Sequence, residues 1–199
     1  MTLVSIIVGS TREGRFSEKV AQWVFAELNA RQEVAATLLD LLEFPMPFFD
    51  QAIPPSMPGR APYADPVVQR WTKEIGKADA FIFVTPEYNH GIPAVLKNAI
   101  DWVNPEWRRK PATFVGYGGV NGARSIEQLR LIACEMQMAP LRSAMHIPMP
   151  ALMAHMQGRD PTLALNESRQ AAEALINDLL WWSDALKAAR EQQARSTQR

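Results

Sequence analysis

The sequence predicts a doubly wound α/β fold, in which helices cover both faces of a parallel sheet. Two observations predict it: short apolar segments alternate with segments of helical periodicity, and the apolar segments are continuous rather than alternating. The chain has 199 residues, 47% of them hydrophobic, which suffices for the core of one large domain. We expect one domain over 1–189, followed by a polar tail over 190–199 that frays.

The beginning of the chain predicts a strand, a helix and a second strand. Val20, Trp23 and Val24 recur at the spacing of one helix face, and Glu18 suits a first helical turn. The segments on either side are apolar and rich in β-branched residues. We expect a strand over 3–8, a helix over 17–28 and a strand over 34–42.

Residues 44–66 interrupt this periodicity, because seven of the fifteen prolines and three phenylalanines fall there. Proline removes a backbone donor and restricts φ, so this segment is an irregular surface excursion. Two interpretations stay open for it: a role in binding or assembly, or a rigid connector whose aromatic side chains pack on the sheet edge.

The remaining chain continues the alternation of helices and strands. We expect helices over 67–75, 94–103, 123–138 and 162–189, and strands over 80–85, 112–117 and 141–146. Pro93 suits the first turn of the second of these helices. In a sheet of this class, ligands bind beyond the carboxyl ends of the strands, where the strand order reverses. The loops after the first, third and fourth strands are therefore the candidate site.

The loop after the first strand reads GSTREGRFS and has the composition of a phosphate site. Ser10, Thr11 and Ser17 supply hydroxyls, Arg12 and Arg15 supply guanidinium groups, and a helix begins directly afterwards. Charge-assisted donors at a helix N-terminus suit a phosphate dianion. The loop lacks both GxxxxGK[ST] and GxGxxG, so a mononucleotide phosphate fits better than a nucleoside triphosphate or a dinucleotide. The plainer interpretation is that Ser17 caps the helix and the arginines are solvated.

The loops after the third and fourth strands suit a planar ring. The first reads TPEYNHGIP, where Tyr88 and Ile92 provide apolar surface and backbone groups near Asn89 provide polar ones. The second reads YGGVNG, and its glycines let the backbone approach a flat ligand. Each loop alone is equally consistent with a tight strand-to-helix turn. Their occurrence together with the phosphate-type loop favours a ligand site.

The chain resembles the NADPH-dependent FMN reductase family of flavodoxin-like proteins, which includes quinone, chromate and azo-dye reductases. The matching segments are GSTREGRFSEKVAQWV, TPEYNHGIPAVLKNAIDWV and GYGGVNGARSIEQLR, and the second is the most specific. They run from the first strand to the helix after the fourth, which is most of the chain. Glu13 and Phe16 stand at variable positions of the first loop.

The resemblance implies a flavodoxin-like five-stranded parallel sheet of order 2-1-3-4-5 and an FMN cradle at its edge. The FMN phosphate would be held by Ser10, Thr11, Arg12, Arg15 and Ser17. The isoalloxazine would be lined by Pro86, Glu87, Tyr88 and Asn89. Its pyrimidine side would be closed by Tyr117, Gly118 and Gly119.

The same resemblance implies a reductase in which NADPH or NADH gives a hydride to FMN N5. A flavin, quinone or similar small-molecule acceptor then takes the electrons, by a ping-pong mechanism with no essential protein acid or base. The alternative is a flavodoxin-type electron carrier without nicotinamide turnover. Such carriers are usually acidic, whereas this chain has 21 basic and 21 acidic residues. An FMN-free regulatory or scaffold protein is a third possibility.

The resemblance also implies a homodimer or homotetramer that packs through the LKNAIDW helix. Leu96, Ala99, Ile100 and Trp102 are the candidate interface residues, although burial in the core explains most of them equally well. Of the adjacent indoles Trp181 and Trp182, we expect one in the core and one at an oligomer contact.

Composition excludes several other classes of partner and site. The zero net charge favours no nucleic acid, and no apolar run is long enough to span a membrane. A lone cysteine, Cys134, forbids an intrachain disulfide, so we expect a cytoplasmic protein. Because a free cysteine behaves as a small apolar residue, we expect Cys134 in the core. His146 and His155 lack partners at metal-ligand spacing, so we expect no metal. His90 either contacts NADPH or the acceptor, or is an exposed turn residue. The methionines after residue 135 favour packing over an acceptor pocket.

Overall fold

The computed structural model describes residues 1–59 and 61–197. Its elements, in chain order, are β1 (Thr2–Val8), α1 (Phe16–Asn29), β2 (Val34–Asp40), η1 (Leu41–Glu43), α2 (Pro66–Lys77), β3 (Ala80–Pro86), α3 (Ala94–Asp101), η2 (Pro105–Trp107), β4 (Pro111–Tyr117), α4 (Ala123–Glu135), β5 (Ala139–His146), α5 (Met149–Met156), α6 (Thr162–Asn166) and α7 (Arg169–Thr197).

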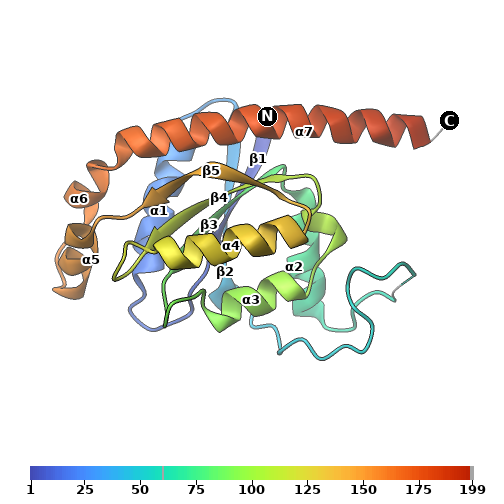
Figure 1. Cartoon of the computed structure of the whole chain (residues 1–199), viewed down its shortest axis with the longest axis horizontal. Helices are drawn as coiled ribbons and strands as arrows, with labels where there is room; N and C mark the ends of the chain where they lie inside the picture. Colours follow the sequence, from blue (N-terminus) through green and yellow to red (C-terminus); the bar gives the residue numbers. More distant parts are fainter. Residues whose placement is uncertain (60, 198–199) are drawn as a thin grey trace.

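The five strands form one parallel sheet in the order β2-β1-β3-β4-β5, which confirms the predicted flavodoxin-like order (Figure 1). Each predicted strand overlaps the observed one to within two residues. The continuous apolar runs predicted the strands correctly because helices cover both faces of the sheet. Strand residues are therefore buried on either side.

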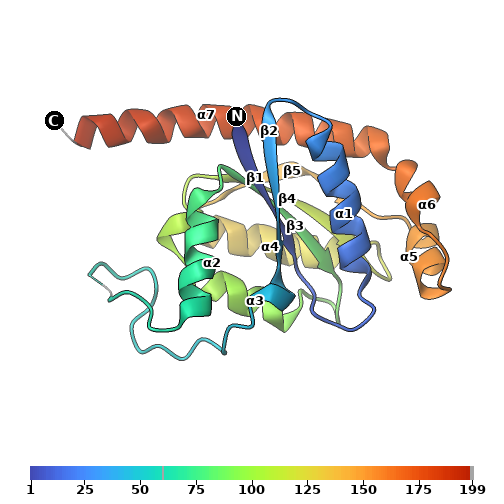
Figure 2. The same ribbon diagram turned by 180° about the vertical axis from the view of Figure 1, so that it is seen from behind.

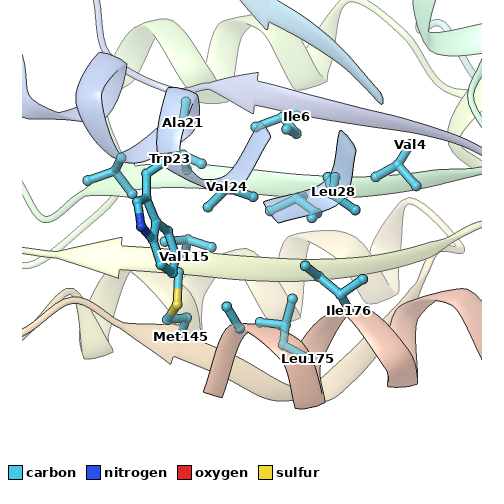
Figure 3. Packing of buried hydrophobic residues seen from close by; sticks show 14 of the residues in the cluster. Val4, Ile6, Ala21, Trp23, Val24, Leu28, Val115, Met145, Leu175 and Ile176 are labelled. Carbon is cyan, nitrogen blue, oxygen red and sulfur yellow. The ribbon is translucent and has the colours of Figure 1, made fainter. Parts of the chain in front are cut away.

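Two hydrophobic clusters hold the helices to the two faces of the sheet. On one face, α1 and α7 pack over the strands, and Trp23 lies among Val115, Met145 and Leu175 (Figure 3). On the other face, α2, α3 and α4 cover the strands, with Trp71 and Trp107 fully buried. Figures 1 and 2 show these two layers from opposite sides. Because helices cover both faces of the sheet, a ligand can reach it only at an edge.

The C-terminal third differs from the predicted elements. The helix predicted over 162–189 is two helices, α6 and α7, and α7 continues to Thr197. Residues 190–197 are therefore helical and do not fray; 198–199 lie outside the described residues. Arg190 ties this end of α7 to the sheet, because its guanidinium contacts Asp79 at 3.2 Å and the Arg109 carbonyl oxygen at 2.7 Å. Helix α5 was not among the predicted elements.

The proline-rich segment is anchored on α3 by polar contacts to its backbone. The Pro47 carbonyl accepts from Asn98 Nδ2 and Trp102 Nε1, both at 2.8 Å, and Phe49 N donates to Asn98 Oδ1 at 2.9 Å. Phe49 packs edge-on against Trp102, which agrees with the connector interpretation. Phe48, however, is 77% exposed, so part of the segment presents apolar surface outward.

Several side chains lie elsewhere than expected. The expected interface residues Leu96, Ala99, Ile100 and Trp102 are at most 2% exposed within this one chain, so core packing accounts for them. Cys134 is exposed and not in the core, because it lies on the outer side of α4. Neither tryptophan of the α7 pair is in the core: Trp181 is 65% and Trp182 38% exposed. Among the described residues, no helix combines the length and apolarity needed to cross a bilayer.

Lys110 is a buried cation at the start of β4. Its ammonium donates to the carbonyl oxygens of Ile75 and Gly76, at 2.9 and 3.0 Å, and so fastens the C-terminal end of α2. Burial, and after it the charge of Arg190, lowers the pKa of Lys110 from 10.5 to about 8. A neutral amine keeps enough hydrogens for both contacts.

This lowered pKa predicts that the protein gains stability as the pH rises from about 8 to 10.5. In that range the unfolded chain binds a proton at Lys110 that the folded chain has lost. The free energy of unfolding should therefore increase, by at most about 1.4 kcal/mol per pH unit. Urea unfolding of the wild type and of Lys110→Met at several pH values measures this, and the difference between the two should grow with pH. A difference independent of pH would contradict it.

Candidate functional site

The first and second candidate loops meet at the carboxyl edge of the sheet. The hydroxyls of Ser10 and Tyr88 are hydrogen-bonded at 2.7 Å, and Ser10 Oγ also accepts from the Arg12 backbone N–H at 3.4 Å. The Arg12 guanidinium carbon lies 5.3 Å from the centre of the Tyr88 ring. Residues that are 78 positions apart in the sequence thus form one contact.

A cavity of about 270 Å³ lies between these loops and is open to solvent. Its lining includes seven of the predicted site residues: Arg12, Arg15, Pro86, Glu87, Tyr88, Tyr117 and Gly118. Ser10 joins the site through Tyr88. Thr11 lines a different hollow, with Leu41 and Phe44, and Asn89 and Gly119 are not in the cavity lining.

The two arginines of the first loop differ in their surroundings. Arg15 is ion-paired with Asp40, at the end of β2, and its side chain is only 7% exposed. Part of the Arg15 guanidinium is therefore already bound to Asp40. The sequence did not indicate this pair. Arg12 is exposed and has no carboxylate within ion-pairing distance in the described parts of the chain. It is the cation of this loop that is available to an anionic ligand.

Ser17 is not the helix cap that the plainer interpretation assumed, because α1 begins at Phe16 with Arg15 in the capping position. Its hydroxyl is buried, and no described residue offers it a hydrogen bond of good geometry. The phenol of Tyr117 faces Ser17. Burial raises the pKa of this phenol well above its ordinary value, and the smaller effect of Ser17 lowers it. Tyr117 is therefore a neutral hydrogen-bonding group at neutral pH.

The second loop is a tight turn that presents Tyr88. Tyr88 and Gly91 exchange backbone hydrogen bonds at 2.9 and 3.1 Å, and Asn89 and His90 between them have φ of 49° and 73°. A Cβ at position 91 would lie 2.7 Å from Gln128 Oε1, so a larger residue there would displace the Gln128 side chain from the turn. His90 is exposed at the tip of this turn.

Residues in the first turns of α4 bind this loop. Arg124 forms an ion pair with the Glu87 carboxylate, which is 3% exposed, and its Nη1 donates to His90 Nδ1 at 3.0 Å. Ser125 Oγ donates to the carbonyl oxygens of Pro86 and Gly91, at 2.9 and 2.8 Å. Gln128 binds the backbone of the loop on both sides of Gly91. These α4 residues position the loop. They lie in the matching segment GYGGVNGARSIEQLR, but the segment did not indicate their contacts with the second loop.

The third loop closes the cavity beside Glu87. Gly118 has φ of 140°, and a Cβ there would lie 3.1 Å from Glu87 Cβ. Glycine therefore lets the third loop lie directly against the second. The backbone N–H of Glu87 donates to the Tyr117 carbonyl at 2.9 Å, which joins the two loops.

The wall contributed by α5 was not predicted. Leu152, His155 and Met156 line the cavity from this helix. His155 Nε2 donates to the Gly14 carbonyl at 2.8 Å, and its ring lies 4.9 Å from that of Phe16. Met156 is thus a cavity residue, although the methionine pattern favoured packing. No sequence motif marks α5, and the contact with Gly14 spans 141 positions.

Groups of His, Cys, Asp and Glu that are close enough to hold a metal ion do not occur among residues 1–59 and 61–197. The charged groups at the cavity are instead two guanidinium groups and two carboxylates, Arg12, Arg15, Glu13 and Glu87. The Glu87 carboxylate is paired with Arg124, so the guanidinium groups and the aromatic walls suit an anionic ligand that carries a planar ring.

The fold and this site define a flavodoxin-like oxidoreductase. The chain belongs to the NADPH-dependent FMN reductase family, whose model matches residues 2–150. An NAD(P)H-dependent FMN reductase of Schizosaccharomyces pombe is 36% identical over 148 residues, 73% of each chain. An NAD(P)H:quinone oxidoreductase of Solanum tuberosum is 34% identical over 65% of this chain and 66% of its own. The flavoenzyme FerB of Paracoccus denitrificans has the same fold, with a TM-score of 0.72 and 21% identity over 93% of this chain and 98% of its own.

The family implies FMN and a nicotinamide cofactor, and the residues of the cavity fit FMN. The exposed guanidinium of Arg12 and the buried Arg15 Nε, which has no hydrogen-bond partner, are suitable donors for a phosphate. Ser17 Oγ also has no hydrogen-bond partner, but Ser17 is not in the cavity lining. The rings of Tyr88, Tyr117 and Phe16 give the aromatic surface that a flavin ring needs.

Replacing Arg12 by Ala should weaken FMN binding by about 1–3 kcal/mol, because it removes a charge-assisted contact to the phosphate. Fluorescence titration of the apoprotein with FMN measures the change. Arg142→Ala, at an exposed position of β5, is the matched control and should bind FMN like the wild type. Equal affinities of the Arg12→Ala and wild-type proteins would show that the first loop does not hold the phosphate.

Replacing Arg124 by Gln should lower the free energy of unfolding by about 1–3 kcal/mol, because it leaves the Glu87 carboxylate without its partner. The effect is below that of a fully buried pair, since the Arg124 side chain is 39% exposed. Urea unfolding of Arg124→Gln, Glu87→Gln and the double variant measures the coupling. We expect the double variant to lose less than the sum of the single losses; additive losses would contradict a clamp.

Proposed function

We propose that the protein is an NAD(P)H-dependent, FMN-containing reductase that passes electrons to a flavin, a quinone or a similar small molecule by a ping-pong mechanism. The observation that carries this proposal is the meeting of the three loops at one cavity, where Ser10 and Tyr88 are in direct contact. The family match and the relatives named FMN reductases and a quinone oxidoreductase support it. When bound, FMN would supply the hydride acceptor, at N5, and the electron donor for the second substrate.

The residues of the first loop would bind the FMN phosphate. Arg12 and the hydroxyls of Ser10 and Ser17 would be the principal donors. Arg15 would contribute through the guanidinium atoms that Asp40 does not use, with its buried Nε still unpaired. Thr11 would require a different rotamer or a backbone contact, because it lines another hollow. The N-terminus of α1 would add the favourable end of its dipole.

The second and third loops would hold and orient the ring. Pro86, Glu87 and Tyr88 line the cavity on one side, and Asn89 would contribute its backbone from the turn. Tyr117 and Gly118 line the other side, and backbone N–H groups of Gly118 and Gly119 would stabilise negative charge along N1 and O2. The Glu87 carboxylate is committed to Arg124 and Tyr117 is neutral, so neither is suited to act as a base.

We further propose a cytoplasmic homodimer or homotetramer. A lone cysteine suits a reducing compartment. Exposed apolar side chains of the anchored proline-rich segment, Phe48, Ile53 and Met57, are 77%, 54% and 54% exposed, and burying them against a second copy would remove them from water. The residues named in the sequence analysis for this role lie in the core, so the contact surface would lie on this segment.

The proposed activity predicts that anaerobic NADPH bleaches the yellow flavin absorbance of the purified protein rapidly, because hydride transfer reduces the bound FMN. An absorbance spectrum before and after NADPH measures this. An acceptor panel with varied NADPH should then give parallel double-reciprocal lines, as one shared cavity requires. Flavin that stays oxidised for minutes would indicate an electron carrier, and a protein that binds no FMN would contradict both functions.

A further inference from the structure

A second hollow adjoins the cavity, between α1 and the turn that joins α5 to α6. Its volume is about 670 Å³. Figures 1 and 2 show α5 and α6 beside α1 at this end of the molecule. His155 lines both spaces, and its hydrogen bond to the Gly14 carbonyl holds the imidazole between them. A ligand in the cavity that extends past His155 therefore reaches this hollow.

The floor of the second hollow is apolar and rigid. Trp23, Pro161 and Leu165 form it, and all three are buried, so only their edges are exposed. Trp23 Nε1 donates to Asn166 Oδ1 at 3.0 Å, which fixes the indole against α6. The body of the indole packs in the core beside Met145 (Figure 3). Such a floor suits the flat, weakly polar face of a base.

The rim of the hollow carries two exposed cations, Lys19 and Arg159. Within residues 1–59 and 61–197, neither has a carboxylate oxygen within 4.0 Å. The one carboxylate of the lining is that of Asp160, and its Oδ1 accepts from Thr162 N at 3.0 Å and Thr162 Oγ1 at 2.7 Å, just before α6. These hydrogen bonds, and to a smaller extent the charge of Lys19, lower the pKa of Asp160. The rim therefore carries two cations and one carboxylate, a net positive charge. Arg159 Nη2 donates to Gln157 Oε1, which leaves the other guanidinium N–H groups and the Lys19 ammonium for an anion.

We propose that this hollow binds the phosphorylated adenosine end of the nicotinamide dinucleotide, while the nicotinamide enters the cavity. The proposal rests on the proposed function, which requires a dinucleotide at the cavity. Arg12 and Arg15 would serve the FMN phosphate, so the phosphates of the dinucleotide need other cations. Lys19 and Arg159 are those cations, and the apolar floor receives the adenine.

Most residues that line this hollow lie after the region matched by the family. Gly158, Arg159, Asp160, Pro161, Thr162 and Leu165 all follow residue 150, where the match to the family ends. The family match therefore does not assign the site. It would give this chain its own means of selecting a nicotinamide dinucleotide.

Calorimetric titration of the purified, FMN-containing protein with 2′,5′-ADP tests the site without turnover. The Lys19→Gln/Arg159→Gln double variant should bind 2′,5′-ADP about tenfold more weakly than the wild type, because both phosphate contacts are lost. The KM for NADPH should rise by a similar factor, while kcat and FMN content stay unchanged. Lys97→Gln, which removes an exposed lysine paired with Asp101 on α3, is the control and should match the wild type.

Two results would overturn the assignment: a wild-type protein that does not bind 2′,5′-ADP, or a double variant that binds it as tightly as the wild type. Failure of the proposed function has a different signature, namely a protein that takes up no FMN and oxidises no NADPH. Titration of that same protein with 2′,5′-ADP still decides whether the hollow is a nucleotide site.

Discussion

The parallel pairing of β1, β3 and β4 is the constraint on which the site depends. Val8 pairs with Val84, and Pro86 pairs with Tyr117, so the three strands end at nearly the same height. Whatever follows each strand must meet at that edge of the sheet. The contact between Ser10 and Tyr88 results from this register, and burial of the strands on both faces makes a register shift costly.

The turn at the cavity is held by α4 residues whose role the motifs did not indicate. Arg124 and Ser125 hold the turn that presents Tyr88, so a chain segment with two positive φ angles keeps one conformation. The ion pair between Glu87 and Arg124 also explains a carboxylate beside a proposed anion site, because its charge is already balanced. Hydrogen bonds and ion pairs of this kind fix the side chains that border a site.

The part of the chain beyond residue 150 adds a layer to the shared fold. α7 packs along one face of the sheet, and Lys187 and Arg190 bind Asp79, the residue before β3. This long helix follows α5 and α6, which lie beside α1 (Figure 1). The shared region supplies the phosphate-type loop and the ring loops, whereas the C-terminal part supplies His155 and Met156 in the wall.

The sequence by itself determined the strands, their order through the family resemblance, and the three loops, because continuous apolar runs and glycine-rich turns are local signals. It did not determine how charges are partnered: the Arg15 pair with Asp40 and the Arg124 pair with Glu87 join positions 25 and 37 apart. Nor did it show that both α7 tryptophans face outward or that α5 borders the cavity. Those features follow from which elements lie side by side, and only the packing of the folded chain decides that.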